Sequence, residues 1–272
     1  MARNIGDLPH ALTHAADLER RLGGRRPAVF LDYDGTLTPI VDRPEDAVIS
    51  PRMREAVREL AKRCPVCVIS GRDRPVVQEL MGLDDLIVAG SHGFDIWSPE
   101  EGTIERGDGL ADFEDLMETV KARLREAMDP IEGAFVEPKK ASVAAHYRLV
   151  AEADRQRIKA VVDELLEAHH DRLKMTPGKM VYELQPKIDW HKGKALLYLL
   201  DTLDLDRDDV VPLFVGDDVT DEDAFRALEG KRGIGIFVGR ADDPEVGGRT
   251  TAADFVLNDV DEVATFLDQL AR

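Results

Sequence analysis

The sequence has little cysteine, few aromatic residues and no long apolar run. Only two of its 272 residues are cysteine, and aromatic residues make up 6%. Two cysteines cannot build a disulfide framework, and no stretch approaches the roughly 18 apolar residues that a membrane span requires. The N-terminal stretch also lacks the apolar segment of a secretory signal. We therefore expect a soluble protein of the reducing cytoplasm.

The two cysteines are spaced as in redox-active pairs, Cys64-x-x-Cys67. A redox motif places its first cysteine at a helix N-terminus, where the thiolate is stabilised. Here the pair runs into the apolar stretch 66–69, which has the character of a buried strand, and free cysteines are commonly buried. We therefore expect two structural thiols and no redox site.

The chain is strongly acidic, with 54 acidic and 36 basic residues and a formal net charge of −18. Such a surface repels nucleic acids and anionic membranes, so we expect neither as a partner. A phosphorylated substrate would be repelled too, and its site must be made locally positive by a metal ion, Lys, Arg or backbone N–H groups. Hydrophobic residues make up 43%, enough for a sizeable core. The sequence leaves the oligomeric state open and is compatible with a monomer.

The order of the apolar segments predicts an α/β core. Strands are expected at 28–31, 66–69 and 86–89, with helices between them. One of these helices has a good start at Ser50-Pro51, an N-cap serine followed by an N1 proline. A short amphipathic helix is expected at 9–22. Alternating strands and helices favour a doubly wound parallel sheet.

Near Gly107 the pattern changes to helix, strand pair, helix, strand pair, which is an α+β arrangement. The expected helices and strands are, in order, 109–128, 134–136, 142–147, 152–169, 173–175 and 180–184. The first pattern then resumes with segments at 191–200, 210–215, 234–238, 255–257 and 259–270. We therefore predict a core of residues 1–107 and 186–272, interrupted by an inserted α+β domain of residues 108–185.

Polar residues follow the ends of several predicted strands. The segments are Asp32-Tyr33-Asp34-Gly35-Thr36, Ser70-Gly71-Arg72 and Gly216-Asp217-Asp218, with Lys192-Gly193 at a helix start. The carboxyl ends of parallel strands face one crevice, so these groups should converge there. Converging carboxylates need a cation, and hard oxygen ligands suit Mg²⁺. The amides of the Gly35 turn, the Ser70 hydroxyl and the Lys192 ammonium suit a phosphate.

This combination fits phosphoryl transfer, which depends mainly on positioning and charge neutralisation. A carboxylate can attack phosphorus and form an aspartyl-phosphate, while a second group protonates the leaving alkoxide and later activates water. Asp32 and Asp34 fit these two roles, and a turn at Gly35 can aim the second carboxylate differently from the first. Asp34 must carry a proton in the first step, which we expect nearby like charge and desolvation to favour.

Taken in chain order, with Lys192-Gly193 third and the Gly216 segment fourth, these segments resemble the four motifs of the haloacid dehalogenase superfamily of phosphatases, over nearly the whole chain. The resemblance implies a doubly wound core and assigns Asp32 as nucleophile and magnesium ligand. It implies that Asp34 is the acid/base and binds magnesium through its backbone carbonyl.

The same resemblance implies a role for the remaining motif residues. Ser70, Gly71 and Lys192 would hold the phosphate. Asp217 would be the distal magnesium ligand, and Asp218 and Asp221 would lie behind the ligands without touching the ion.

The inserted segment narrows the resemblance to the trehalose-6-phosphate phosphatases. The segments that carry it are Gly90-Ser91-His92-Gly93, Glu137-Pro138-Lys139, Ser142, His146-Tyr147-Arg148, Tyr182-Glu183-Leu184-Gln185-Pro186, Trp190 and Thr220-Asp221-Glu222. In that family the insertion is a cap that closes over the core and reads the sugar. The residues that match its sugar-contacting positions are Glu137, Lys139, Arg148 and Glu183. His191 is a mild departure, because a smaller polar residue is commoner there.

The resemblance therefore implies a magnesium-dependent hydrolase of trehalose biosynthesis, with trehalose 6-phosphate as its small-molecule partner. A related phosphatase of another phosphorylated disaccharide, or of a glycosyl-glycerol or glycosyl-glycerate compound, is an alternative with the same catalytic motifs. A non-catalytic sugar-phosphate sensor is a further alternative, against which the intact catalytic residues stand.

Each motif by itself also has a simpler interpretation. The Asp32 segment is similar to a calcium loop, but an EF-hand needs Gly at the sixth and Glu at the twelfth position, where this loop has Leu37 and Arg43. Lys192 alone would be a surface residue, and Asp217-Asp218 alone a helix start. The charged residues of the cap could form a surface ion-pair network. The joint order of the motifs favours a site.

Overall fold

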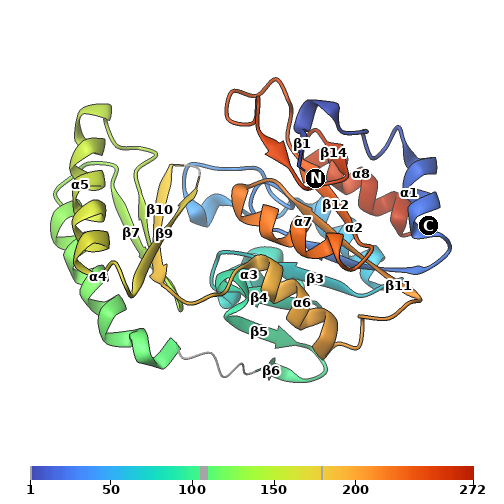
Figure 1. The fold of residues 1–272 in the computed structure, drawn as a ribbon, viewed down its shortest axis with the longest axis horizontal. Coiled ribbons are helices and arrows are strands. Elements are labelled where there is room, and N and C mark those ends of the chain that lie inside the picture. Colours follow the sequence, from blue (N-terminus) through green and yellow to red (C-terminus); the bar gives the residue numbers. More distant parts are fainter. Residues whose placement is uncertain (1, 105–109, 179) are drawn as a thin grey trace. The chain divides into compact units, whose positions relative to one another are not determined.

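In the computed structural model, which describes residues 2–104, 110–178 and 180–272, the chain divides into two units (Figure 1). The first unit consists of Met1–Ile104 and His191–Arg272, and the second of Glu105–Trp190. Each unit has its own sheet and its own apolar core.

The first unit contains a sheet of eight strands in the order β14-β12-β11-β2-β3-β4-β5-β6. These strands are β2 (Arg26–Leu31), β3 (Val66–Ile69), β4 (Ile87–Gly90), β5 (Asp95–Ser98), β6 (Gly102–Ile104), β11 (Val210–Gly216), β12 (Ile234–Val238) and β14 (Phe255–Leu257). The helices are α1 (Ala15–Leu22), α2 (Pro51–Ala61), α3 (Arg74–Met81), α6 (Lys192–Thr202), α7 (Glu222–Glu229) and α8 (Val260–Leu270). Short elements are β1 (Arg3–Asn4), β13 (Thr250–Thr251) and the 3₁₀ turns η1 (Ile5–Asp7), η2 (Pro44–Asp46), η3 (Ser91–Gly93) and η5 (Val219–Asp221).

The strands from β14 to β4 are parallel, and helices lie on both faces of the sheet (Figure 1). Apolar side chains point to both faces of the sheet, so both faces need a cover. On one face, Val29 and Leu31 of β2 belong to a core that includes residues of α1, α2 and α8. On the other face, Phe214 of the neighbouring strand β11 packs against Phe225 of α7, with 5.7 Å between the ring centroids. The predicted doubly wound α/β core is therefore confirmed.

Helix α2 begins as the sequence predicts. The Ser50 hydroxyl accepts a hydrogen bond from the Met53 N–H at 3.1 Å, which satisfies one of the unpaired donors of the first turn. Its apolar positions, Met53, Val57 and Leu60, are buried in the core.

Three features of the first unit differ from the prediction. Helix α1 starts only at Ala15, because His10 forms a bridge to Val256 and holds the preceding segment extended. The antiparallel edge strands β5 and β6 were not expected, since they are short and have mixed composition. Helix α7 was also missed, because it follows directly on the acidic segment after β11.

The second unit is a four-stranded antiparallel sheet with two helices on one face. Its elements are η4 (Leu110–Phe113), α4 (Glu114–Met128), β7 (Phe135–Pro138), β8 (Val143–His146), α5 (Glu152–Ala168), β9 (Leu173–Gly178) and β10 (Val181–Pro186). Val136 and Leu184 pack against the helices. Because strand side chains alternate, their neighbours Glu137 and Glu183 belong to the opposite, polar face.

The predicted domain boundaries can be placed on this structure. The first, between 107 and 108, lies outside the described residues. The second, between 185 and 186, falls within β10, where Pro186 still pairs with Leu173 of β9. The second unit continues to Trp190.

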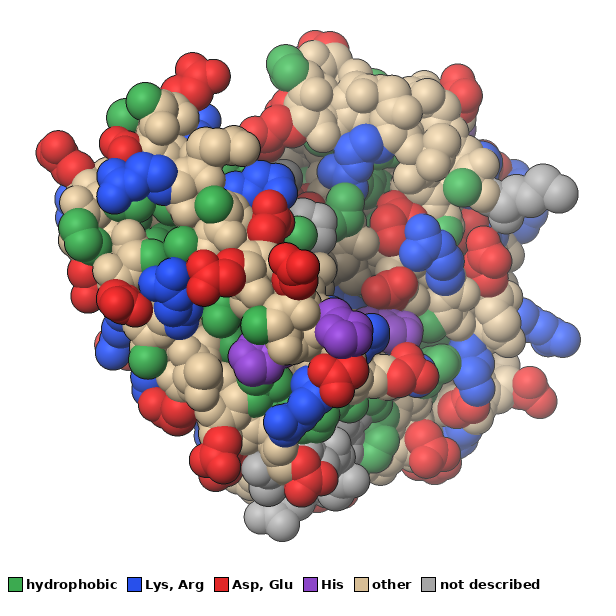
Figure 2. All heavy atoms as spheres, turned by 60° about the vertical axis from the view of Figure 1, so that its left-hand side comes forward, with side chains coloured by type: hydrophobic (Ala, Val, Ile, Leu, Met, Phe, Trp, Pro, Cys, Tyr) green, Lys and Arg blue, Asp and Glu red, His purple; other side chains and the backbone are tan. Residues whose placement is uncertain are grey.

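The surface carries charges of both signs. Figure 2 shows acidic and basic side chains interspersed over the face in view. None of the helices in the described part of the chain has the length and apolar character that crossing a bilayer requires.

Both cysteines are buried and unbridged; Cys64 lies two residues before β3 and Cys67 lies within it. Burial raises the pKa of Cys64 to about 11 and also raises the pKa of Cys67. The thiolate is the reactive form of cysteine, so both thiols are held in an inert state.

We expect both thiols to resist labelling by a disulfide reagent such as DTNB in native buffer and to react fully in guanidinium chloride. The measurement is the absorbance of the released thiolate over time. An Asp171→Cys variant adds an exposed thiol as a control and should react at once. Native labelling of Cys64 or Cys67 at the rate of that control would contradict their burial.

Candidate active site

The ends of β2 and β11 lie where the strand order of the central sheet reverses. From this point β2, β3 and β4 follow in one direction, and β11, β12 and β14 in the other. The crevice at such a reversal is the usual ligand site of an open α/β sheet. Asp32 directly follows β2, Asp217 directly follows β11, and the Asp32 N–H still donates to the Val215 carbonyl at 2.9 Å. The sheet thus delivers both aspartates to the same place.

Asp32, Asp217 and Asp221 form a cluster of buried carboxylates, with one oxygen from each within 4.8 Å of the others. Lys192, the first residue of α6, enters the same cluster. Its Nζ lies 2.9 Å from Asp32 Oδ1 and 2.6 Å from Asp221 Oδ1. The ammonium group therefore contacts two of the three carboxylates in the interior of the first unit.

This arrangement changes the protonation behaviour of its members. Burial, together with repulsion from Asp221 and Asp217, raises the pKa of Asp32 well above its usual range, although Lys192 opposes the shift. Burial also works against a charge on Lys192, but Asp221 and Asp32 outweigh it and hold the pKa of Lys192 above its usual range. The lysine therefore stays a cation, and the carboxylates remain short of positive charge.

Asp221 uses both of its oxygens inside the protein. Oδ1 accepts from Lys192 Nζ at 2.6 Å, and Oδ2 accepts from the backbone N–H groups of Asp217 and Asp218, each at 2.9 Å. The side chain thereby fixes the loop after β11 and the ammonium group of Lys192 at once. Asp218, the next residue after Asp217 in this loop, is only partly buried.

The residues present fit a divalent cation held by oxygen. Asp32 and Asp217 supply hard carboxylate donors of the kind that Mg²⁺ prefers. Gly35, at φ +77°, allows the Asp217 carboxylate to approach the turn after β2, because a Cβ at Gly35 would lie 2.1 Å from Asp217 Oδ2. The pKa of Asp32 is raised by burial and also by repulsion from Asp221 and Asp217, and a cation here would relieve that repulsion.

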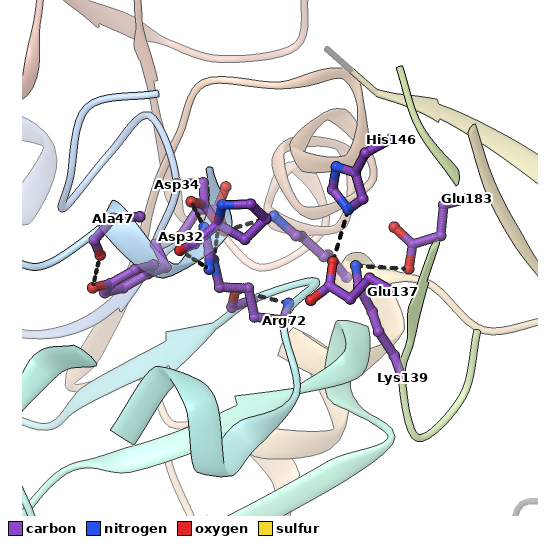
Figure 3. Close-up of polar contacts among 12 residues, drawn as sticks. Asp32, Asp34, Ala47, Arg72, Glu137, Lys139, His146 and Glu183 are labelled. Atoms are coloured by element: carbon purple, nitrogen blue, oxygen red, sulfur yellow. Dashed lines mark hydrogen bonds and ion pairs between the residues drawn. The ribbon is translucent and has the colours of Figure 1, made fainter. Parts of the chain in front are cut away.

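The turn after β2 separates the two aspartates of the first motif. The N–H of Leu37 and the N–H of Gly35 close the turn onto the carbonyls of Tyr33 and Thr38, each at 2.8 Å. As a result the Asp32 carboxylate contacts Lys192. Asp34 points instead toward Arg72 (Figure 3).

The surroundings of Asp34 differ from the expectation. We expected like charge and desolvation, but the guanidinium of Arg72 binds both oxygens of Asp34 at 2.6 Å each. The Asp34 side chain is also one-third exposed. The turn and the length of the Arg72 side chain account for the difference, because together they bring an opposite charge to the carboxylate.

Ser70 and Gly71 follow β3, the strand next to β2, so they lie along the same edge of the sheet. The Ser70 side chain is buried, and its hydroxyl accepts from the Arg72 N–H at 3.1 Å. The Ser70 carbonyl accepts from the His92 N–H at 2.8 Å. Gly71 leaves room for the His92 ring, which would lie 2.7 Å from a Cβ there.

The cap residues of the sequence analysis lie in the second unit and form two contacts (Figure 3). Lys139 Nζ lies 3.3 Å from Glu183 Oε1, which also accepts from the Ser142 hydroxyl at 2.6 Å. Glu137 Oε2 lies 2.8 Å from His146 Nε2. Arg148 lies in the turn that follows β8.

Sequence reasoning assigned no role to Arg72 and left His146 open between a structural and a functional role. Both stand in segments that it singled out, Ser70-Gly71-Arg72 and His146-Tyr147-Arg148. The usable signal for Arg72 was its place directly after a buried strand, because an arginine buried there must be paired.

Solved structures share this fold. The match to a haloacid dehalogenase-like hydrolase from Bacteroides thetaiotaomicron covers 90% of this chain and 100% of the hydrolase, with a TM-score of 0.63 and 19% identity. The match to the C-terminal domain of trehalose-6-phosphate phosphatase from Candida albicans covers 97% of this chain and 98% of that domain, with a TM-score of 0.81 and 25% identity. The fold and its acidic site define a hydrolase of the haloacid dehalogenase type.

Sequence comparison narrows the class. The sequence profile of the trehalose-phosphatase family matches residues 30–261. The trehalose-phosphate phosphatase of Mycobacterium bovis is 42% identical over 271 residues, which are 99% of this chain and 67% of that protein. The chain belongs to the trehalose-phosphatase family and is a phosphoric monoester hydrolase.

The close approach of Asp217 to Gly35 gives a test of the site. We expect Gly35→Ala to lower phosphatase activity by about 100-fold or more, because the added methyl group displaces the Asp217 carboxylate. Activity is measured as phosphate release and stability as the thermal unfolding midpoint.

Gly248→Ala is the matched control, because Gly248 has the same φ of +77° and no atom within 4 Å of the added Cβ. Both variants should lose about 1–2 kcal/mol of stability through left-handed strain. Only Gly35→Ala should lose activity, and equal activity in the two variants would contradict the proposed crowding.

Proposed function

We propose that this protein hydrolyses trehalose 6-phosphate to trehalose and inorganic phosphate in a magnesium-dependent reaction. The observation that carries the proposal is the buried group of Asp32, Asp217 and Lys192 at the reversal point of the sheet. Relatives named as trehalose-phosphate phosphatases, one of them 42% identical over 99% of this chain, support the choice of substrate.

Asp32 is the proposed nucleophile. One carboxylate oxygen attacks phosphorus, and the bond between phosphorus and the sugar oxygen breaks, which leaves an aspartyl-phosphate. The Ser70 hydroxyl, the Gly71 N–H and the Lys192 ammonium hold the phosphate oxygens. Because Lys192 is buried and held by Asp221, its charge is pre-oriented and needs no rearrangement during the reaction.

Mg²⁺ is the proposed cofactor, held by the carboxylates of Asp32 and Asp217 and by the backbone carbonyl of Asp34. When bound it neutralises charge on the phosphate. Asp221 and Asp218 support the site from behind, since Asp221 ties Lys192 to the loop that carries Asp217.

Asp34 is the proposed acid and base. It gives a proton to the sugar oxygen as that oxygen leaves phosphorus, which yields trehalose. It then takes a proton from the water that attacks the aspartyl-phosphate, and the attack releases phosphate and restores the Asp32 carboxylate. Protons and bonds balance over the two steps.

The polar face of the second unit is the proposed sugar-reading surface. Glu137, Lys139, Arg148 and Glu183 offer acceptors and donors for sugar hydroxyls. Glu137 and Glu183 are already oriented by His146 and by Lys139 with Ser142. Groups held in place in this way lose less conformational entropy when the sugar binds.

The substrate and the nucleophile are tested by phosphate release from a panel of sugar phosphates, with Mg²⁺ and with EDTA. The panel contains trehalose 6-phosphate, sucrose 6-phosphate, glucosylglycerol phosphate, glucosyl-3-phosphoglycerate and glucose 6-phosphate. We expect turnover of trehalose 6-phosphate to be fastest, to stop with EDTA and to return with Mg²⁺.

Asp32→Asn should abolish turnover and keep the fold, because an amide oxygen does not attack phosphorus. Asp242→Asn, a change in an exposed ion pair with Arg240, is the control and should be fully active. Preference for another member of the panel would overturn the substrate. Binding of trehalose 6-phosphate by the wild type without any turnover would favour a sensor.

The sugar-reading surface is tested with Glu183→Gln. This change keeps the shape of the side chain but removes its charge, so we expect the KM for trehalose 6-phosphate to rise by about 10- to 100-fold. The control is Glu164→Gln, which changes a glutamate that pairs with Arg123 on the helical side of the same unit. An unchanged KM in Glu183→Gln would remove Glu183 from the sugar site.

A further inference from the structure

Arg72 links three segments of the first unit and has no part in the reaction proposed so far. Its side chain is nine-tenths buried. Nε and Nη2 donate to Asp34 Oδ2 and Oδ1 at 2.6 Å each (Figure 3). Nη1 donates to the Pro44 carbonyl at 2.7 Å. All three guanidinium nitrogens therefore have a partner.

The backbone of Arg72 is also held in place by hydrogen bonds. The Arg72 N–H donates to the Ser70 hydroxyl at 3.1 Å, and its carbonyl accepts from the Ser91 N–H at 2.7 Å. Its Cζ lies 5.8 Å from the centroid of the Tyr33 ring. Tyr33 is itself buried and donates its hydroxyl to the Ala47 carbonyl at 2.6 Å. Arg72 thus reaches Asp34 from a rigid support.

A paired contact of this kind orients a carboxyl group. Two parallel N–H···O bonds fix both the plane and the direction of the acceptor, which a single bond or the point charge of a lysine does not. Asp34 needs such a constraint, because its side chain is one-third exposed and it lies in the turn after β2 rather than in a strand. A group that transfers a proton must meet the reacting oxygen in a narrow range of geometry.

We propose that Arg72 is a positioning residue that aims the carboxyl group of Asp34 at the leaving oxygen of the substrate. The inference rests on the proposed function, since it assigns Asp34 the acid/base role. One Asp34 oxygen turns to the substrate and gives its proton to the sugar oxygen as the bond to phosphorus breaks. The other oxygen keeps its hydrogen bond to Arg72, and the paired carboxylate forms again once the proton has left.

A purely structural role predicts a different behaviour. The contact with the Pro44 carbonyl also ties the loop at η2 to the loop after β3, and its loss would disturb both loops regardless of the substrate. A positioning role acts through Asp34 alone. If Arg72 acts in this way, substituting it should have little effect on activity when Asp34 cannot transfer a proton. The size of the effect should also depend on whether the leaving group needs a proton.

The first experiment is a double-mutant cycle with Arg72→Lys, Arg72→Gln and Asp34→Asn, followed as kcat/KM for trehalose 6-phosphate with Mg²⁺. We expect Arg72→Gln to lower kcat/KM by about 100-fold or more, within the range of general acid catalysis. Arg72→Lys should lower kcat/KM nearly as far, because the ammonium group keeps the charge but cannot donate two parallel hydrogen bonds to Asp34. In the Asp34→Asn background the Arg72 changes should cost less than about threefold, which makes the two sites strongly non-additive.

The second experiment replaces the substrate with p-nitrophenyl phosphate, whose leaving group departs without a proton. The loss in kcat/KM should then shrink to less than about tenfold for the Arg72 variants and for Asp34→Asn alike. The control is Arg74→Gln, which removes an arginine two residues after Arg72 that is paired with Asp95. This change should lower the turnover of both substrates equally and only weakly. If the wild type does not cleave the aryl ester, the double-mutant cycle decides by itself.

Additive losses in the cycle would overturn the positioning role, as would equal losses on the two substrates. Thermal unfolding shows whether a variant is folded, and Arg72→Lys keeps the test open if Arg72→Gln is not. Absence of turnover of trehalose 6-phosphate by the wild type would refute the proposed function instead, so the two failures are distinguishable.

Discussion

Asp32, Asp217 and Asp221 place three carboxylates within 4.8 Å of one another in the interior of the first unit. Buried charges are costly unless they are paired, and the only ammonium group of this cluster among the described residues is Lys192. Burial, followed by repulsion from Asp221 and Asp217, raises the pKa of Asp32. The negative charge that Lys192 leaves uncompensated also makes these oxygen donors a fitting place for a divalent cation. The surrounding parts of the site follow from this constraint. Gly35 gives Asp217 room, and Asp221 holds Lys192 and the loop after β11 together.

The turn after β2 gives different surroundings to two identical side chains. Asp32 is buried and faces Lys192, whereas Asp34 is partly exposed and faces the fork of Arg72. A nucleophile benefits from a fixed position beside the cation that neutralises the phosphate. A proton-transferring group benefits from an orientation that still allows one of its oxygens to turn. The contacts of the two aspartates therefore match the two roles proposed for them.

The second unit orients its acidic residues by a similar device. Glu183 is held by Lys139 and Ser142, and Glu137 by His146, all on the face of the sheet that the helices leave uncovered. An ionised carboxylate has about four acceptor positions, so a carboxylate that is held by one or two hydrogen bonds can accept others as well. This is how a polar surface can be both ordered and available to a sugar.

The amino-acid sequence alone determined the α/β core and the edge of the sheet at which its polar residues meet. Long apolar runs such as 210–215 and 234–238 have few alternatives to a buried strand, and parallel order brings Asp32, Ser70 and Asp217 to one edge. Short elements of mixed composition, such as β5 and β6, carry no such signal, and the start of α1 depends on a bridge between His10 and Val256 that local sequence does not show. The partner of Asp34 was likewise decided only by the tertiary structure, because Arg72 lies 38 residues away in the chain. Periodicity and motif order report which groups are present and along which edge they lie, but the contact that each side chain makes depends on how the folded loops aim it.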